Sequence, residues 1–204
     1  EIRSIDTTAR EKLPGVVKVG TGKGCHYHYG DNFKDLVPMA VKKVRYIGEP
    51  VAAVIAETLA QAEAALEKIK VEYKPLPVYI DARDAMKPDA VLVHEENGDY
   101  WHLPTLHPTP GTNIAHTYHL KKGKGVDGFK DAEVIVEAEF NYPLGSCAAI
   151  EPHGSIVWFK EDKTIEVWSS SICPFIIRED LAHSYEIPVS DVRVRIPDIG
   201  GCFG

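Results

Sequence analysis

The sequence closes on Gly-Gly-Cys-Phe-Gly at residues 200–204, directly after an alternating run that predicts a strand. Glycines in such a position let backbone N–H groups come close to an anionic ligand such as a phosphate. The run is not a Walker loop, because no Gly-Lys-Ser/Thr follows it, and the Gly-x-Gly-x-x-Gly fingerprint is absent as well. A tight turn that holds no ligand is the alternative, and the pattern by itself favours the turn.

A second cluster with possible chemistry is Cys25, His26 and His28, where the two histidines would face one side of a strand. A metal site needs three or four ligands at fixed geometry, and no complete set is evident in the sequence. We therefore predict no metal ligands and expect loop or surface histidines, with a metal-binding module on these three residues as a third hypothesis. The same interpretation applies to His107, His116 and His119.

Two carboxylates and one thiol stand at positions where they could be reactive. Glu151 and Glu49 each precede a proline beside an apolar run, and such a setting can raise a carboxyl pKa and create a general acid or base. Either carboxylate can equally accept backbone hydrogen bonds at a turn, which is the role that we favour. Cys173 precedes a predicted helix, whose N-terminus can lower a thiol pKa, although an inert thiol is favoured. We predict no catalytic residue in this sequence.

The elements that must position these residues begin with a compact α+β unit over residues 1–93. The best helix is expected at 58–70, where Thr58 and Gln61 have the spacing of a capping box. The run 51–56 is apolar at every position, which predicts burial on both faces. Strands are expected at 1–6, 16–22, 43–58 with a turn at 48–50, and 71–80, and a short helix at 6–13.

Residues 94–120 contain three prolines, two glycines and five histidines without periodicity, which predicts a long surface connection. Regular secondary structure is expected again after residue 120. A helical turn and a strand are expected within 125–143, a hairpin at 153–171, a helix at 174–188 with Pro174 in its first turn, and a strand at 191–197.

Composition narrows the function classes. The net charge of −7 argues against a nucleic-acid binder, which needs a basic patch for phosphates. No apolar run is long enough to cross a bilayer, so no membrane partner is expected. Four widely spaced cysteines predict reduced thiols and a cytoplasmic protein. The sequence opens on an expected strand already in progress, so we expect that the natural N-terminus lies outside it.

Seven segments, taken together and in order, resemble one family: residues 4–19, 44–58, 62–78, 131–143, 150–159, 167–175 and 192–204. They are similar to the large, molybdopterin-binding subunit of the molybdenum hydroxylases, the xanthine dehydrogenase and aldehyde oxidase type. The resemblance implies an α+β protein with an α/β hammerhead domain at 1–95, a connecting segment at 96–120, and the first part of a mixed α/β molybdopterin-binding domain at 121–204.

The resemblance also implies a cofactor and the residues beside it. The family's glycine turn reads Gly-Gly-Gly-Phe-Gly-Gly-Lys, so Cys202 here replaces a glycine. Ile172 stands where the family commonly has a glutamine near the metal, and its side chain cannot donate a hydrogen bond. The implied cofactor is molybdenum-molybdopterin, either plain or in its cytosine dinucleotide form. The implied cofactor-binding residues are Gly200, Gly201, Cys202, Phe203, Gly204 and Ile172.

By the same resemblance, the reaction is oxidative hydroxylation of an aldehyde, a purine or an N-heterocycle with water-derived oxygen. The implied partners are the remaining part of the molybdopterin-binding subunit, an FAD-binding subunit and a 2Fe-2S iron–sulfur subunit. The family's later cofactor-binding segments and its catalytic glutamate are not in this sequence, so the 204 residues alone are expected to be inactive. The alternative is a non-catalytic structural or assembly subunit, which docks on a partner chain that completes the cofactor site.

Overall fold

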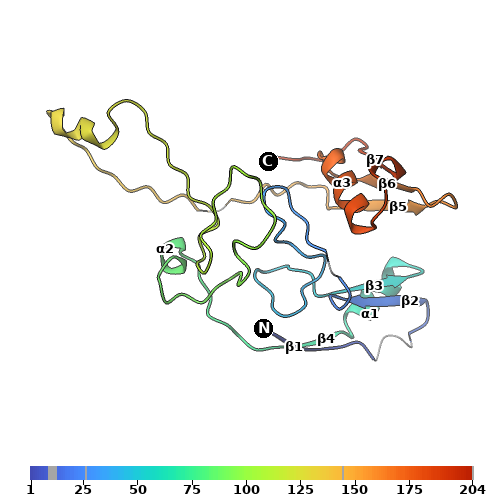
Figure 1. Ribbon diagram of the computed structural model, residues 1–204. Coiled ribbons are helices and arrows are strands. Elements are labelled where there is room, and N and C mark those ends of the chain that lie inside the picture. Colours follow the sequence, from blue (N-terminus) through green and yellow to red (C-terminus); the bar gives the residue numbers. More distant parts are fainter. Residues whose placement is uncertain (9–12, 26, 144, 204) are drawn as a thin grey trace. The chain divides into compact units, whose positions relative to one another are not determined.

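The computed structural model describes residues 1–8, 13–25, 27–143 and 145–203. It divides into two compact units, Glu1–His119 and Leu120–Gly204, which are described separately (Figure 1). Helices and sheets occur in both units, so the predicted α+β class is confirmed. The finer division at residues 95 and 120 stays a prediction. Among the described residues, no helix has the length and apolar character that crossing a bilayer requires.

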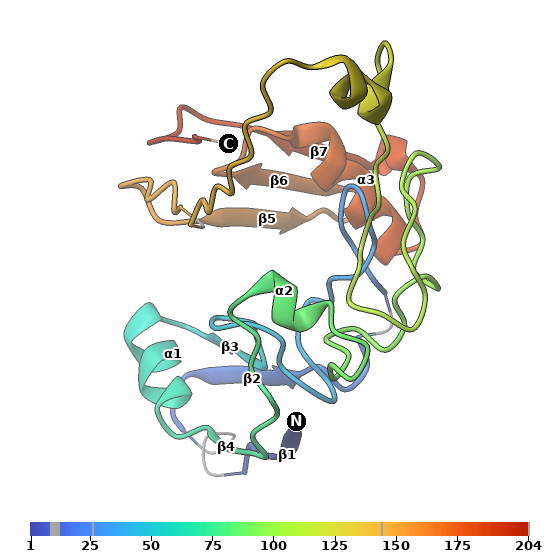
Figure 2. The same ribbon diagram turned by 90° about the vertical axis from the view of Figure 1, so that its left-hand side faces the viewer.

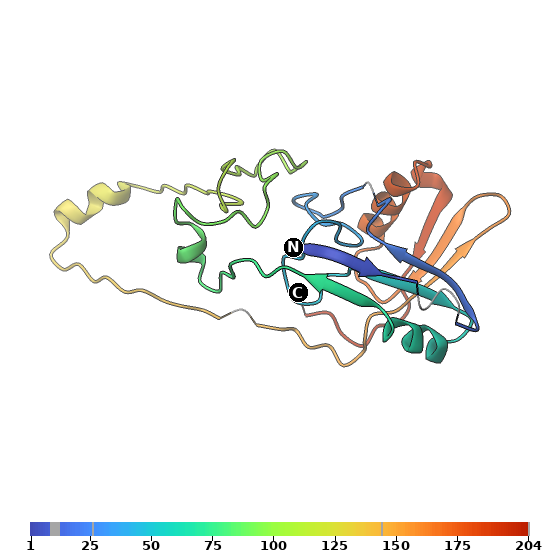
Figure 3. The ribbon, with the colours of Figure 1, turned by 90° about the horizontal axis from the view of Figure 1, so that it is seen from below.

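The first unit contains two antiparallel strand pairs, which are seen from below in Figure 3. Strand β1 (Ile2–Asp6) pairs with β4 (Lys70–Tyr73), and β2 (Val16–Thr21) pairs with β3 (Ala52–Ala56). Helix α1 (Leu59–Leu66) packs against β2 and β3. Its Ala65 is fully buried, and the small side chain allows the helix to approach the sheet closely.

Helix α1 begins as the sequence predicts. The Gln61 N–H donates to Thr58 Oγ1 at 3.3 Å, and the Thr58 N–H donates to Gln61 Oε1 at 3.1 Å, which completes the capping box. The helix ends at Leu66, earlier than the predicted residue 70, because Lys70 already belongs to β4. A short helix, α2 (Ala82–Ala85), was not predicted; the Arg83 N–H donates to Asp81 Oδ1 at 2.8 Å at its start.

The strand predicted over 43–58 is wrong in its first half, where residues 43–47 form no strand. The Arg45 N–H donates to the Glu49 carboxylate, and the Glu49 N–H donates to the Tyr46 carbonyl at 3.3 Å. A side chain therefore takes the backbone donor that a neighbouring strand would need. The same hydrogen bond confirms the structural role favoured for Glu49, whose side chain is buried beside the Arg45 guanidinium.

Three further predictions for this unit differ from the structure or fall outside its described residues. Burial of β3 on both faces is wrong, because its residues alternate and Ile55 is 58% exposed. The strand predicted over 71–80 ends at Tyr73, since the prolines that follow cannot donate to a ladder. The helix predicted at 6–13 falls largely on residues 9–12, which lie outside the described residues.

The second unit has a three-stranded sheet of β5 (Ser155–Phe159), β6 (Ile165–Ser169) and β7 (Val192–Arg195), shown in Figure 2. Strands β5 and β6 form the predicted hairpin, and β6 and β7 run parallel. Helix α3 (Pro174–Ser184) and the 3₁₀ turn η2 (Val189–Asp191) connect the parallel pair, as a parallel connection requires. Helix α3 starts on Pro174 as predicted and ends before residue 188.

The segment before this sheet departs from prediction. The helical turn is present as the 3₁₀ helix η1 (Gly125–Asp131), but the described residues 132–143 form no strand. Their alternation of apolar side chains is real, yet a strand also needs a partner for its backbone hydrogen bonds. The apolar side chains of this segment are exposed: Val134, Ile135, Val136, Phe140 and Tyr142.

Candidate functional site

The topology of the second unit brings three loops to one edge of the sheet. Parallel strands β6 and β7 end at the same edge, and β5 begins there because it runs antiparallel to β6 (Figure 2). Residues 150–154, 170–173 and 196–203 therefore lie at this edge. Ser170 Oγ accepts from the Gly154 N–H at 2.9 Å and donates to the Gly154 carbonyl at 3.1 Å, which ties two of the loops. The carboxyl ends of parallel strands are the usual ligand-binding edge of α/β sheets.

The glycine turn is held by the first of these loops. The Gly200 N–H donates to the carboxylate of Glu151. A Cβ on Gly200 would lie 2.5 Å from Glu151 Cβ, and a Cβ on Gly201, whose φ is +131°, would lie 2.8 Å from Phe203 Cε2. Both positions therefore require glycine. The structural role favoured for Glu151 is confirmed, because its carboxylate accepts a backbone hydrogen bond.

The rest of the turn presents backbone donors. The N–H groups of Gly201, Cys202 and Phe203 have no hydrogen-bond partner within the part of the chain that the structure describes. The side chains of Cys202 and Phe203 are exposed. A turn with unsatisfied N–H donors and no bulky side chain at its bend can receive an anionic group, so these residues fit the cofactor that the resemblance implies. Gly204 lies outside the described residues.

Ile172 lies on the loop that follows β6, and its side chain is 57% exposed. Beside it, the Cys173 N–H donates to Ser171 Oγ at 3.2 Å, and Cys173 is the residue before the first turn of α3. The nearest neighbours of Gly200 and Gly201 come from the 149–151 loop and from Phe203, not from Ile172. Ile172 therefore shares the edge with the turn, while its role in cofactor binding stays a prediction.

An ion cluster that was not predicted connects the strands of this sheet. Glu166 on β6 is only 5% exposed. It accepts hydrogen bonds from Lys160 Nζ at 2.7 Å and from Arg195 Nε at 2.5 Å, so it links β6 to the end of β5 and to β7. Hydrogen bonds from Lys160 and Arg195 lower the pKa of Glu166 to about 2. The signal that was available is a carboxylate between Ile165 and Val167 in an otherwise apolar strand.

The described histidines that were considered as metal ligands lie in loops of the first unit. The ring of His28 lies 5.6 Å from that of Tyr100, between centroids, and the His107 N–H donates to His116 Nδ1 at 2.9 Å. His26 lies outside the described residues. Within the described ranges, no three His, Cys, Asp or Glu side chains are close enough to hold a metal ion. Cys25, Cys173 and Cys202 are free thiols.

Two family models match the chain. Residues 1–77 match the a/b hammerhead domain of aldehyde oxidase and xanthine dehydrogenase, and residues 106–204 match the molybdopterin cofactor-binding domain. The second match includes every loop at the sheet edge described above. The two matches together define a molybdopterin-binding protein with a preceding hammerhead domain.

Known relatives align with the whole length of this chain. The chain is 30% identical over 206 residues to a probable xanthine dehydrogenase component of Bacillus subtilis, and 32% identical over 222 residues to the carbon monoxide dehydrogenase large chain of Afipia carboxidovorans. All of this chain and 26% of each relative are covered, so the chain spans about a quarter of the length of these relatives.

Solved structures give the same result. The carbon monoxide dehydrogenase of Oligotropha carboxidovorans superposes on the whole chain with a TM-score of 0.82 at 28% identity, and 26% of that chain is covered. The aldehyde oxidoreductase of Desulfovibrio gigas gives a TM-score of 0.79 at 26% identity, with 22% of that chain covered. The chain belongs to the molybdenum hydroxylase family, in the group of the xanthine dehydrogenase and aldehyde oxidase large subunits.

Proposed function

We propose that this chain forms part of the molybdopterin-binding catalytic subunit of a molybdenum hydroxylase. The reaction is oxidative hydroxylation of an aldehyde, a purine or another N-heterocycle, with the oxygen derived from water. The observation that supports this proposal is the Gly200–Phe203 turn, which presents unsatisfied backbone donors at the ligand-binding edge of a parallel strand pair.

In this proposal the chain's own residues bind and orient the cofactor. The N–H groups of Gly201, Cys202 and Phe203 hold its anionic part, and Glu151 fixes the turn through the Gly200 N–H. Once bound, the molybdenum cofactor supplies the oxidation chemistry, and the protein supplies position and electrostatics. Ile172 contributes an apolar surface beside the site instead of the amide donor usual in the family.

The proposal extends to partners and location. The family implies a cytosine dinucleotide form of the cofactor as one option, with FAD and 2Fe-2S groups on partner subunits that accept the electrons. The remaining part of the molybdopterin-binding subunit completes the site, because the chain corresponds to about a quarter of its relatives. Free thiols at Cys25, Cys173 and Cys202 support a cytoplasmic location.

The test substitutes a glycine of the turn in the complete native protein. Gly200→Ala places a methyl group against Glu151, so we expect the molybdenum content per protein to fall well below that of the wild type. Gly128→Ala is the matched control, because a Cβ there would meet no atom within 4 Å. Mass spectrometry of the metal and a thermal melt are measured together. Full molybdenum content in Gly200→Ala, with a native melt, would contradict the proposal.

A non-catalytic assembly subunit is the second candidate, and one observation favours it. The apolar side chains of residues 134–142, and those of β5, are exposed within their unit. Such surfaces suit a partner polypeptide that completes the site. Native mass spectrometry with activity measurement separates the candidates: a stoichiometric partner that holds molybdenum without turnover supports assembly, and turnover supports catalysis.

A further inference from the structure

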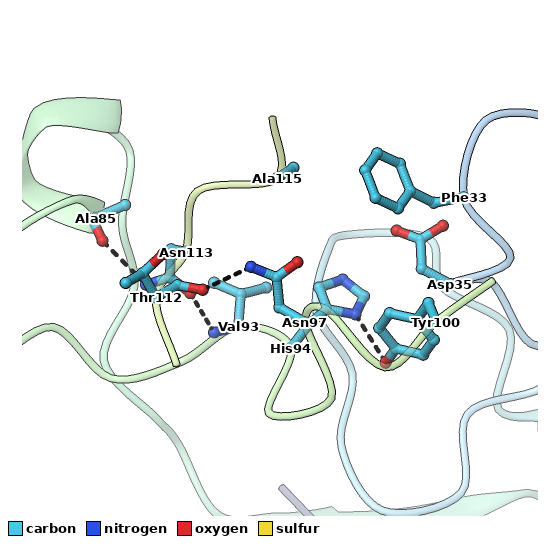
Figure 4. Close-up of a pocket in the computed structure, with 10 residues that line it drawn as sticks. All are labelled: Phe33, Asp35, Ala85, Val93, His94, Asn97, Tyr100, Thr112, Asn113 and Ala115. Carbon is cyan, nitrogen blue, oxygen red and sulfur yellow. Dashed lines mark hydrogen bonds between the residues drawn. The ribbon is translucent and has the colours of Figure 1, made fainter. Parts of the chain in front are cut away.

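A cavity of about 330 Å³ lies in the first unit, and none of its lining residues belongs to the glycine turn. Its walls come from the loops around residues 33–35, 93–100 and 112–115 and from Ala85 at the end of α2, and Figure 4 shows the side chains that line it. The volume is roughly ten times the share of one water molecule in the liquid, which is enough for a small organic molecule. The polar groups on the cavity walls determine which kind of small molecule it can bind.

The first polar group is the side-chain oxygen of Asn97. Its Nδ2 donates to the carbonyls of Thr112 at 2.8 Å and Ile114 at 3.1 Å, and lies 3.3 Å from that of Thr109. Carbonyls only accept, so the nitrogen must face them and the orientation of the amide is fixed. The Oδ1 atom consequently turns away from Thr112, as Figure 4 shows, and no described residue donates to it.

The second polar group is a ring nitrogen of His94. The Tyr100 hydroxyl donates its single hydrogen to Glu96 Oε2 at 3.1 Å. The same hydroxyl oxygen lies 3.2 Å from His94 Nδ1, and because it has no second hydrogen it must accept this hydrogen bond from the ring. His94 therefore carries its hydrogen on Nδ1, and Nε2 keeps a lone pair. Burial, followed by the charge of Arg45, lowers the pKa of His94, which keeps the ring neutral at pH 7. Burial and Glu96 raise the pKa of Tyr100 to about 12, so the hydroxyl stays protonated.

The third polar group is the carboxylate of Asp35. It is half-buried on the cavity wall and has no hydrogen bond or ion pair with any described residue. Lys43 and Arg45, whose charges act on His94, pair with other carboxylates: Lys43 Nζ lies 2.7 Å from Glu95, and Arg45 lies 3.7 Å from Glu49. Asp35 is thus an anionic group of the cavity without a counter-ion in the described structure.

These observations specify the ligand by chemistry. The cavity offers three acceptors, Asn97 Oδ1, His94 Nε2 and the Asp35 carboxylate, beside the aromatic ring of Phe33 (Figure 4). We propose that it binds a small planar organic cation of the amidinium or guanidinium class. Such a cation has several N–H donors for the acceptors, a charge that pairs with Asp35, and a flat face that packs on an aromatic ring.

The experiment titrates the complete protein, in the assembly in which it is isolated, with benzamidinium by isothermal calorimetry. Benzamide is the neutral analogue of nearly the same shape. We expect saturable binding of benzamidinium and at least roughly tenfold weaker binding of benzamide, because a charge-assisted hydrogen bond is lost. The variant Asp35→Asn should also weaken benzamidinium binding by about tenfold or more.

Asp31→Asn is the matched control, since Asp31 is exposed, does not line the cavity and undergoes the same chemical change. It should leave the affinity within about twofold of the wild type. Equal affinity for benzamide and benzamidinium, no saturable heat, or full affinity in Asp35→Asn with a native melt would each overturn the proposal. The benzamide comparison uses the wild type, so it decides the question even if Asp35→Asn does not fold. Molybdenum content plays no part in the readout, and this inference therefore stands or fails apart from the proposed function.

Discussion

The central strand of the second unit, β6, allows a test of how the sheet supports the three loops at its edge. Val167 on β6 is 3% exposed, and its cross-strand partner Val157 on β5 is 48% exposed. Replacing valine by alanine removes two carbon groups, each worth about 0.8 kcal/mol when fully buried. Val167→Ala should therefore cost about 1.6 kcal/mol of transfer free energy, with a cavity contribution that brings the total to about 2 kcal/mol. Val157→Ala should cost no more than about 0.8 kcal/mol, since half of its surface is already in water.

The assay is urea unfolding followed by tryptophan fluorescence, because Trp158 and Trp168 lie in the same sheet and report its loss. The two variants share one substitution and one pair of facing strands, so each is the control for the other. Equal losses of unfolding free energy would refute the argument that β6 is the buried strand of this unit. The same outcome would also contradict the argument that buried β6 holds the three loops at the sheet edge in place.

Three other outcomes are expected. Thr58→Ala should lower the free energy of unfolding of the first unit by about 1 kcal/mol through loss of the α1 cap, while Thr105→Ala, at an exposed position, should not. The pKa of Glu166 is lowered from 4.5 to about 2, so its contribution to the free energy of unfolding is present above pH 4.5 and is lost as the pH falls toward 2. Glu166→Gln should remove this loss of stability between pH 4.5 and 2 when unfolding is measured against pH. Ile172→Gln should leave the thermal melt unchanged, since Ile172 is exposed, and alter the Mo(V) electron paramagnetic resonance signal of the complete protein; an unaltered signal would place Ile172 away from the metal.

Local signals in the sequence were sufficient for several elements. The Thr58–Gln61 cap, Pro174 at the first turn of α3 and the hairpin within 153–171 each depend on residues close in sequence. The resemblance, carried by segments in order, was sufficient for the family. The same reasoning placed a strand at 43–47 and another after η1, because apolar alternation does not reveal whether a partner strand is available.

Groups brought together from distant parts of the chain could be found only in the tertiary structure. Asp35, His94 and Asn97 line one cavity although some sixty positions separate the first from the others, and Glu166 meets Lys160 and Arg195 across three strands. The edge that joins residues 149–154 to the glycine turn likewise depends on the parallel pairing of β6 and β7. The sequence by itself determined the family and the local starts and turns of its elements. The fold decided which unpaired donors and acceptors face one another, because their spacing in space is set by strand pairing and loop closure, which no short stretch of residues encodes.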